Sequence, residues 1–190
     1  MISNYNDDII NSLKILEEGG LILYPTDTIW GLGCDATNES AVAKIFSLKS
    51  RVDTKALIIF VKDQQQLLHY VSKPSPVLFD YQQKQPRPTT AIYSNAINLP
   101  QNLTGTDNSI AIRIPSDPFC LEMLVKFGKP IVSTSANISG LPSPSNFNDI
   151  SNEIKSGVDY IVKHRQNDLS LSTPSMIIML ENDQVKILRS

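Results

Sequence analysis

Short apolar runs alternate with amphipathic helical patterns in the first half of the chain, and this alternation constrains the fold most. Apolar residues recur at helical spacing over 7–18 and again over 39–48. Continuous apolar runs at 21–24 and 57–61 follow them and predict buried strands. Gly19 and Gly20 form a natural stop after the first helix. The pattern predicts two βα units.

The remaining sequence continues this reading, with more strands toward the C-terminus. Helices are predicted at 64–70, 76–83, 119–127 and 147–155, and strands at 89–94, 109–114, 131–134, 160–163, 176–180 and 184–188. Residues 181–183 read as a hairpin turn. We therefore expect an α/β protein with a twisted mixed β-sheet and flanking helices. At 190 residues, a single domain over 1–190 is expected.

A polar loop at 24–35 follows the first predicted strand. Pro25 cannot extend a central ladder, and Thr26 to Thr28 offer hydrogen-bonding side chains. Gly31 and Gly33 permit positive φ and a close approach of backbone to a ligand. A loop that only connects two elements does not need all of these features, so we expect a binding loop.

Composition excludes several classes of protein. The formal net charge of −2 argues against a protein that coats nucleic acid. The polar, acidic start of the chain lacks a secretory signal pattern, and the longest apolar runs are far too short to span a bilayer. We expect a cytoplasmic protein with no membrane contact. Cys34 and Cys120 lack zinc or redox spacing and are expected to be reduced and buried.

Three cations, Lys49, Arg51 and Lys55, follow the predicted helix at 39–48. The plain reading is a helix C-terminus that attracts cations through its dipole. The functional reading is a triphosphate clamp, in which Arg51 offers a planar fork and the lysines offer compact charges. Spacing alone leaves both readings open.

Two further groups also have a structural and a functional reading. The polar run 133–140 either bonds its own backbone as a turn or contacts a ligand. Arg113 alternates with apolar residues on a predicted strand, and this pattern alone favours a solvent-facing side chain.

The sequence also matches the pattern of a dinucleotide-binding fingerprint. Gly31, Gly33 and Ala36 satisfy Gly-x-Gly-x-x-Ala, and Asp53 lies about 20 residues beyond. Polar residues separate the first glycine from its strand, however, and Asp53 sits among cations, so a nicotinamide enzyme is disfavoured. The two histidines, His69 and His164, are isolated, and no metal site is expected.

Four blocks carry a family resemblance. They are Pro25 to Gly33, Lys49-Ser50-Arg51 with Lys55, Ser109 to Pro115, and Pro130 to Gly140. Together and in this order they resemble the YrdC-like threonylcarbamoyl-AMP synthases over almost the whole chain. The resemblance implies a YrdC-like fold with a concave basic cavity. It also implies that Arg113 faces that cavity.

The resemblance also implies roles for particular residues. The catalytic group would be Lys49, Arg51, Ser135 and Asn137. ATP would contact Arg51, Lys55, Ser109, Ser135, Ser143 and Arg189. Threonine would contact Thr28, Phe60, Arg113, Ser133 and Ser175. This chain departs from the usual family residues at Trp30, Phe60, Arg87 and Met176, where relatives have Tyr, His, Gly and Thr.

The implied activity is that of a nucleotidyltransferase. L-threonine, bicarbonate or CO2, and ATP would give threonylcarbamoyl-adenylate and pyrophosphate, with Mg²⁺ carried on the nucleotide and no tightly bound cofactor. The product would pass to tRNA threonylcarbamoyl transferase proteins for the modification of adenosine 37, with a possible contact to tRNA itself.

Two other functions remain open. One is an RNA-binding module with a basic concave face and no nucleotide turnover. The other is a carbamoyl-adenylate enzyme of the hydrogenase-maturation type, which normally has further segments that this chain lacks.

Overall fold

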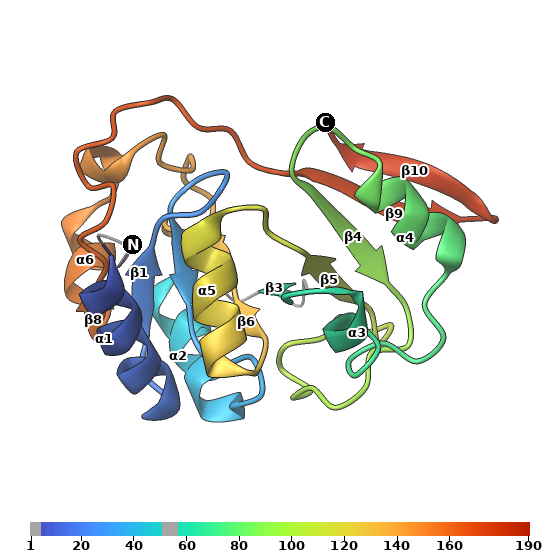
Figure 1. The fold of residues 1–190 in the computed structure, drawn as a ribbon, viewed down its shortest axis with the longest axis horizontal. Coiled ribbons are helices and arrows are strands. Elements are labelled where there is room, and N and C mark those ends of the chain that lie inside the picture. The colour runs from blue at the N-terminus through green and yellow to red at the C-terminus, as the bar shows by residue number, and fades with distance from the viewer. Residues whose placement is uncertain (1–4, 51–56) are drawn as a thin grey trace.

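The computed structural model describes residues 5–50 and 57–190, which form two mixed β-sheets with helices around them. Figure 1 shows the smaller sheet beside α1 (Asn6–Glu17), α5 (Pro118–Phe127) and α6 (Asn152–Ser156). On the other side, α4 (Pro76–Gln83) lies against the strands of the larger sheet. The segment between residues 161 and 176 crosses from one sheet to the other.

The smaller sheet has the strand order β7-β2-β1-β8. Its strands are β1 (Ile22–Tyr24), β2 (Gly31–Gly33), β7 (Thr134–Ser135) and β8 (Tyr160–Ile161). β1 pairs antiparallel with β2 and parallel with β8. β1 ends just before Pro25, as predicted, and the chain returns to β2 through the polar loop.

The larger sheet has the order β10-β9-β4-β5-β3-β6. Its strands are β3 (Ile58–Phe60), β4 (Thr89–Tyr93), β5 (Ile110–Arg113), β6 (Ile131–Val132), β9 (Met176–Glu181) and β10 (Gln184–Arg189). β3–β5 and β4–β9 are parallel pairs, and the other pairs are antiparallel. The predicted α/β class with mixed pairing is confirmed, but the expected single sheet is two sheets.

Local signals in the sequence set most helix ends. α2 (Glu39–Leu48) begins where the Asn38 side chain accepts a hydrogen bond from the Ala41 amide. α5 has Asp117 as its N-cap and ends at Gly128, which has a φ of 74°. The short α3 (Gln64–Leu67) also begins at an aspartate cap, Asp63. In the described part of the chain, no helix has the length and apolar content needed to cross a membrane.

Ser133 lies at the junction of the two sheets. The strand before it, β6, belongs to the larger sheet, and the strand after it, β7, belongs to the smaller one. The Ser133 amide donates to the Ile58 carbonyl at 2.8 Å, while Ser135 is paired with Gly31. The sheets therefore diverge from this point, and polar residues of the 133–135 segment lie where they separate.

The two sheets share a hydrophobic core. One buried cluster joins Leu23 and Leu32 of the smaller sheet to Ile59 and Ile112 of the larger one. In a second buried cluster, α1 and α5 pack against Tyr24 of the smaller sheet and Phe60 of the larger sheet. Cys34 and Cys120 are buried, as predicted, and neither is in a disulfide.

Two sequence predictions about elements were wrong. Residues 31–33 form strand β2, and neither Gly31 nor Gly33 has a positive φ. Gly33 is needed for close packing, because a Cβ there would lie 2.7 Å from the Tyr24 ring and 2.9 Å from the Val132 carbonyl. The helix predicted at 147–155 is a 3-10 turn, η1 (Phe147–Asp149), followed by α6.

Candidate active site

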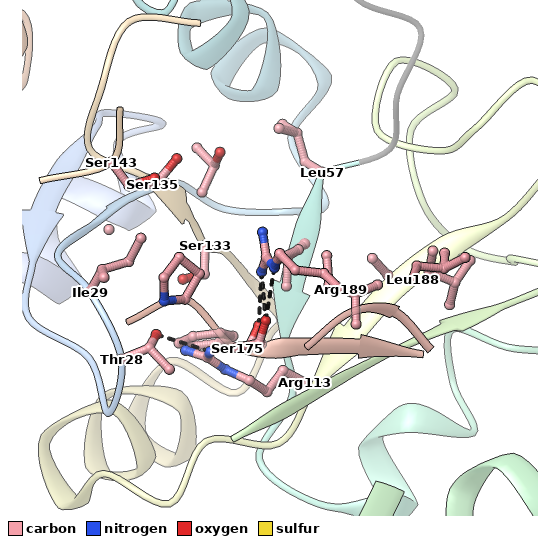
Figure 2. A pocket seen from close by; sticks show the side chains of 18 of the residues that line it. Thr28, Ile29, Leu57, Arg113, Ser133, Ser135, Ser143, Ser175, Leu188 and Arg189 are labelled. Atoms are coloured by element: carbon pink, nitrogen blue, oxygen red, sulfur yellow. Dashed lines mark hydrogen bonds between the residues drawn. The ribbon is translucent and has the colours of Figure 1, made fainter. Parts of the chain in front are cut away.

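A cavity of about 810 Å³ opens between the diverging sheets. This volume is in the range of small-molecule sites. The smaller sheet contributes the loop from Thr28 to Trp30, and the larger sheet contributes an apolar floor that includes Ile92 and Ile177. Figure 2 shows hydroxyl and guanidinium groups from both sides around this space.

Arg113 is the most enclosed cation of the cavity, with 3% of its surface exposed. Its Nη1 donates to Thr28 Oγ1 at 3.0 Å, and its Nη2 lies 2.9 Å from Asp27 Oδ1. The Phe60 ring lies against the guanidinium, with 4.4 Å from Cζ to the ring centroid. The solvent-facing orientation favoured by strand alternation was therefore wrong.

Burial lowers the pKa of Arg113, and the Asp27 carboxylate opposes this shift. Arginine remains charged under these conditions because its pKa starts far above neutrality. The buried Nε has no hydrogen-bond partner among the described residues. A buried donor without a partner is costly.

Lys49 lies beside Ser135 and Asn137, as the resemblance implied, but its ammonium group binds backbone. Nζ donates to the Ser135 carbonyl at 2.5 Å and to the Asn137 carbonyl at 2.6 Å. Lys49 is 3% exposed. Neither Lys49 nor Asn137 lines the cavity. Its contacts tie the end of α2 to the 135–137 loop.

Ser175 and Arg189 contact each other in the wall of the cavity. Arg189 Nε and Nη2 donate to the Ser175 carbonyl at 3.0 and 2.8 Å, and Figure 2 shows this contact beside Arg113. Ser175 Oγ also lies 2.8 Å from Thr90 Oγ1, a buried group that the sequence interpretation missed. Although Arg189 is next to the last residue, β10 places it at the cavity.

A family model described as "Telomere recombination", that of the Sua5/YciO/YrdC proteins, matches residues 14–190. The chain belongs to this family. The predicted YrdC-like resemblance is thereby confirmed, and the family match covers both sheets and the cavity between them.

Relatives within the Sua5/YciO/YrdC family match in sequence and in fold. The threonylcarbamoyl-AMP synthase of Escherichia coli K12 is 36% identical over 141 residues, which cover 72% of this chain and 73% of that protein. The crystal structure of P. abyssi Sua5 complexed with L-threonine superposes with a TM-score of 0.84 at 27% identity, covering 95% of this chain and 53% of that one. This chain therefore spans about half the length of that Sua5. E. coli YciO gives 0.83 at 26% identity, covering 97% and 89%.

Most residues that the Sua5/YciO/YrdC resemblance implied do line the cavity. They are Thr28, Phe60, Ser109, Arg113, Ser133, Ser135, Ser143, Ser175 and Arg189. Arg51, Lys55 and Asp53 fall within 51–56 and lie outside the described residues. Their assignment therefore stays a prediction.

Asp27 and Asp107 are two carboxylates whose roles the sequence did not indicate. Asp27 Oδ2 accepts from the amide and hydroxyl of Ser116, while its Oδ1 faces Arg113. Asp107 lines the cavity beside Ser109 and accepts from its amide at 3.1 Å. Asp27 lies inside the matched block 25–33 and Asp107 lies two residues before the block 109–115, and these positions were the available signals.

The basic character expected for the cavity is not seen in the described residues. Among these, the charged residues that line it are Arg113, Arg189 and Asp107. Within the same part of the chain, no three His, Cys, Asp or Glu side chains gather in a way that could hold a metal ion. The described site therefore offers buried hydrogen-bond donors and hydroxyls more than a strong positive field.

Proposed function

We propose that this chain is an L-threonylcarbamoyladenylate synthase. The observation that carries the proposal is the buried Arg113, with an unpartnered Nε, inside the cavity of a Sua5/YciO/YrdC family member. Two relatives support it: the E. coli protein is a threonylcarbamoyl-AMP synthase, and P. abyssi Sua5 has been crystallised with L-threonine. A single domain over 1–190 would carry the reaction.

The reaction balances in two steps. The threonine amine attacks the carbon of bicarbonate, a C–N bond forms, and water leaves to give the carbamate. A carbamate oxygen then attacks the α-phosphorus of ATP, and the bond to pyrophosphate breaks. Both steps join charged groups, so the protein must position them and offset charge on the phosphates.

Arg113 is the candidate for binding the threonine carboxylate. Its Nη2 faces Asp27 and its Nη1 is held by Thr28, so the guanidinium is fixed in one orientation at the cavity wall, where it can bind a carboxylate. Thr28 supports the amino-acid site by orienting Arg113. Phe60, Ser133 and Ser175 complete the side-chain surroundings of threonine.

ATP is assigned to the rest of the cavity. Ser109, Ser135, Ser143 and Arg189 line it and offer hydroxyl and guanidinium donors. Arg51 and Lys55 are proposed to offset charge on the triphosphate. Lys49 and Asn137 are proposed to hold the catalytic 135–137 loop in its conformation. Mg²⁺ would arrive on the nucleotide, where it screens the phosphate charges.

The product is proposed to serve cytoplasmic tRNA modification, through separate threonylcarbamoyl transferase proteins. Direct contact with tRNA is a separate part of the proposal, and an RNA-binding module without turnover is the competing function. The described cavity residues give that alternative little support, because they do not form a basic concave face.

Pyrophosphate release tests the proposal. With ATP present, release should require both threonine and bicarbonate, because the attacking carboxylate is made from them. Equal release with ATP alone would refute the synthase. Salt-dependent tRNA binding without pyrophosphate release would instead favour the RNA-binding module.

The Arg113→Gln variant links this reaction to the site. Losing a hydrogen bond to a charged group should raise the KM for threonine roughly 10- to 100-fold, with a smaller effect on the KM for ATP. Arg165→Gln is a matched control, because Arg165 pairs with Asp117 at 2.8 Å next to the same loop but outside the main cavity. Equal effects of both changes on threonine would remove Arg113 from the amino-acid site.

A further inference from the structure

A second cavity of about 680 Å³ adjoins the amino-acid end of the main one. Thr28, Pro174 and Arg189 line both cavities, so the two meet beside the residue that holds Arg113. Arg87 lines only the second cavity. This second cavity therefore leads to the place where threonine is proposed to bind.

Arginines dominate the charged side chains of this second cavity. Arg87 and Arg189 face one carboxylate side chain, Asp27, whose Oδ1 lies against Arg113 and whose Oδ2 binds Ser116. The positive charge of Arg87 and Arg113 contributes, after burial, to the lowered pKa of Arg189, which indicates that the three guanidinium groups are close. Ser190, the final residue of the sequence, also lines this space.

The two arginines differ in how firmly they are held. Arg189 lines the cavity and is anchored to the Ser175 carbonyl through its Nε–Nη2 edge. Arg87 is exposed, and its side chain makes no hydrogen bond or ion pair with the described residues. Thr89 Oγ1 donates a hydrogen bond to the Arg87 carbonyl at 2.9 Å, so the backbone that carries the exposed guanidinium is held in place.

We propose that Arg87 and Arg189 form an anion-collecting entrance through which bicarbonate reaches threonine. The inference rests on the proposed synthase function. Bicarbonate is the smallest anionic substrate of that reaction, and it must reach the threonine amine while the bulkier ATP and threonine occupy the main cavity. Because Asp27 is paired with Arg113, Arg87 and Arg189 leave the side chains of this cavity with a net positive charge, which raises the local concentration of an anion.

The test measures pyrophosphate release against bicarbonate concentration, at saturating ATP and threonine. Carbonic anhydrase keeps bicarbonate and CO2 at equilibrium, and the C-terminus carries no tag because Ser190 lies at the entrance. Arg87→Gln should raise the KM for bicarbonate roughly 3- to 10-fold, with the KM for ATP and threonine unchanged. Arg87→Lys should restore most of the loss.

Lys84→Gln is the matched control. Lys84 is an exposed cation at the end of α4, three residues away, and it lines neither cavity. This variant should keep the wild-type KM for bicarbonate. Added salt should raise that KM in the wild type and in Lys84→Gln, but much less in Arg87→Gln.

An unchanged KM for bicarbonate in Arg87→Gln would overturn the proposal. A rise in the KM for ATP instead would assign Arg87 to the nucleotide and would also overturn it. Wild-type protein that releases no pyrophosphate with all three substrates would refute the synthase function itself, which is a distinguishable outcome.

Discussion

The Asp27–Arg113 ion pair is the most consequential contact of single residues in the structure. Its nitrogen and oxygen lie 2.9 Å apart, and the two side chains are 4% and 10% exposed. The pair Lys186–Glu181 has the same separation, but both of its side chains are about half exposed. Burial therefore distinguishes two ion pairs of equal length.

Removing one partner of each pair should have different effects on stability. Asp27→Asn leaves Arg113 buried beside a neutral group and should lower the free energy of unfolding by about 3 kcal/mol. Glu181→Gln should change it by less than about 1 kcal/mol, because water screens the exposed pair. Denaturant midpoints at a common m-value provide the comparison. Similar losses for both variants would show that the buried pair does not stabilise the fold.

At the scale of elements, Lys49 joins the end of α2 to the 135–137 loop. Lys49→Met leaves two carbonyl groups without their donor, which should lower the free energy of unfolding by about 1 to 3 kcal/mol. Turnover should fall with it, because the loop carries Ser135 into the cavity.

Lys44→Met is the control on the same helix. Lys44 Nζ also donates to a backbone carbonyl, that of Gly19 at 2.8 Å, but Lys44 is exposed and does not line the main cavity. Urea unfolding and steady-state rates measure both effects. Full turnover and stability in Lys49→Met would contradict the role assigned to the lysine.

The elements that the sequence predicted well have local causes. Helical patterns predicted α2 and α5 within a residue of their ends, and the structure shows the Asn38 and Asp117 caps just before these patterns. The β9–β10 hairpin was predicted from its turn, where Asn182 and Asp183 have φ values of 50° and 60°. Such signals need only neighbouring residues.

The elements that the sequence missed depend on distant partners. Gly31 and Gly33 form a strand because Tyr24 and Ser135 pair with Gly31 on either side and because the space beside Gly33 admits no Cβ. Arg113 is buried since β5 has a neighbour on each edge and packs on both faces, which strand alternation cannot reveal. The family motifs supplied the cavity orientation that the local pattern did not.

At the scale of the whole molecule, the shared core predicts that the two sheets unfold as one cooperative unit. Trp30, the single tryptophan, is 6% exposed, lines the cavity and packs on Phe147 with ring centroids 4.8 Å apart. Its fluorescence therefore reports the region between the sheets, whereas far-ultraviolet circular dichroism reports the helices and strands of both. A single cooperative transition requires the two signals to coincide.

Ligand binding between the sheets should raise the stability of this whole unit. ATP at about 100 times its Kd adds about 2.7 kcal/mol to the free energy of unfolding. For a chain of this length each kcal/mol raises Tm by about 2 to 4 °C, so the expected shift is about 5 to 10 °C. Both probes should move together, because a ligand held by β2, β5 and β10 is lost when either sheet unfolds. A shift in Trp30 fluorescence without a shift in circular dichroism would mean that the smaller sheet unfolds independently and that the cavity does not couple the two.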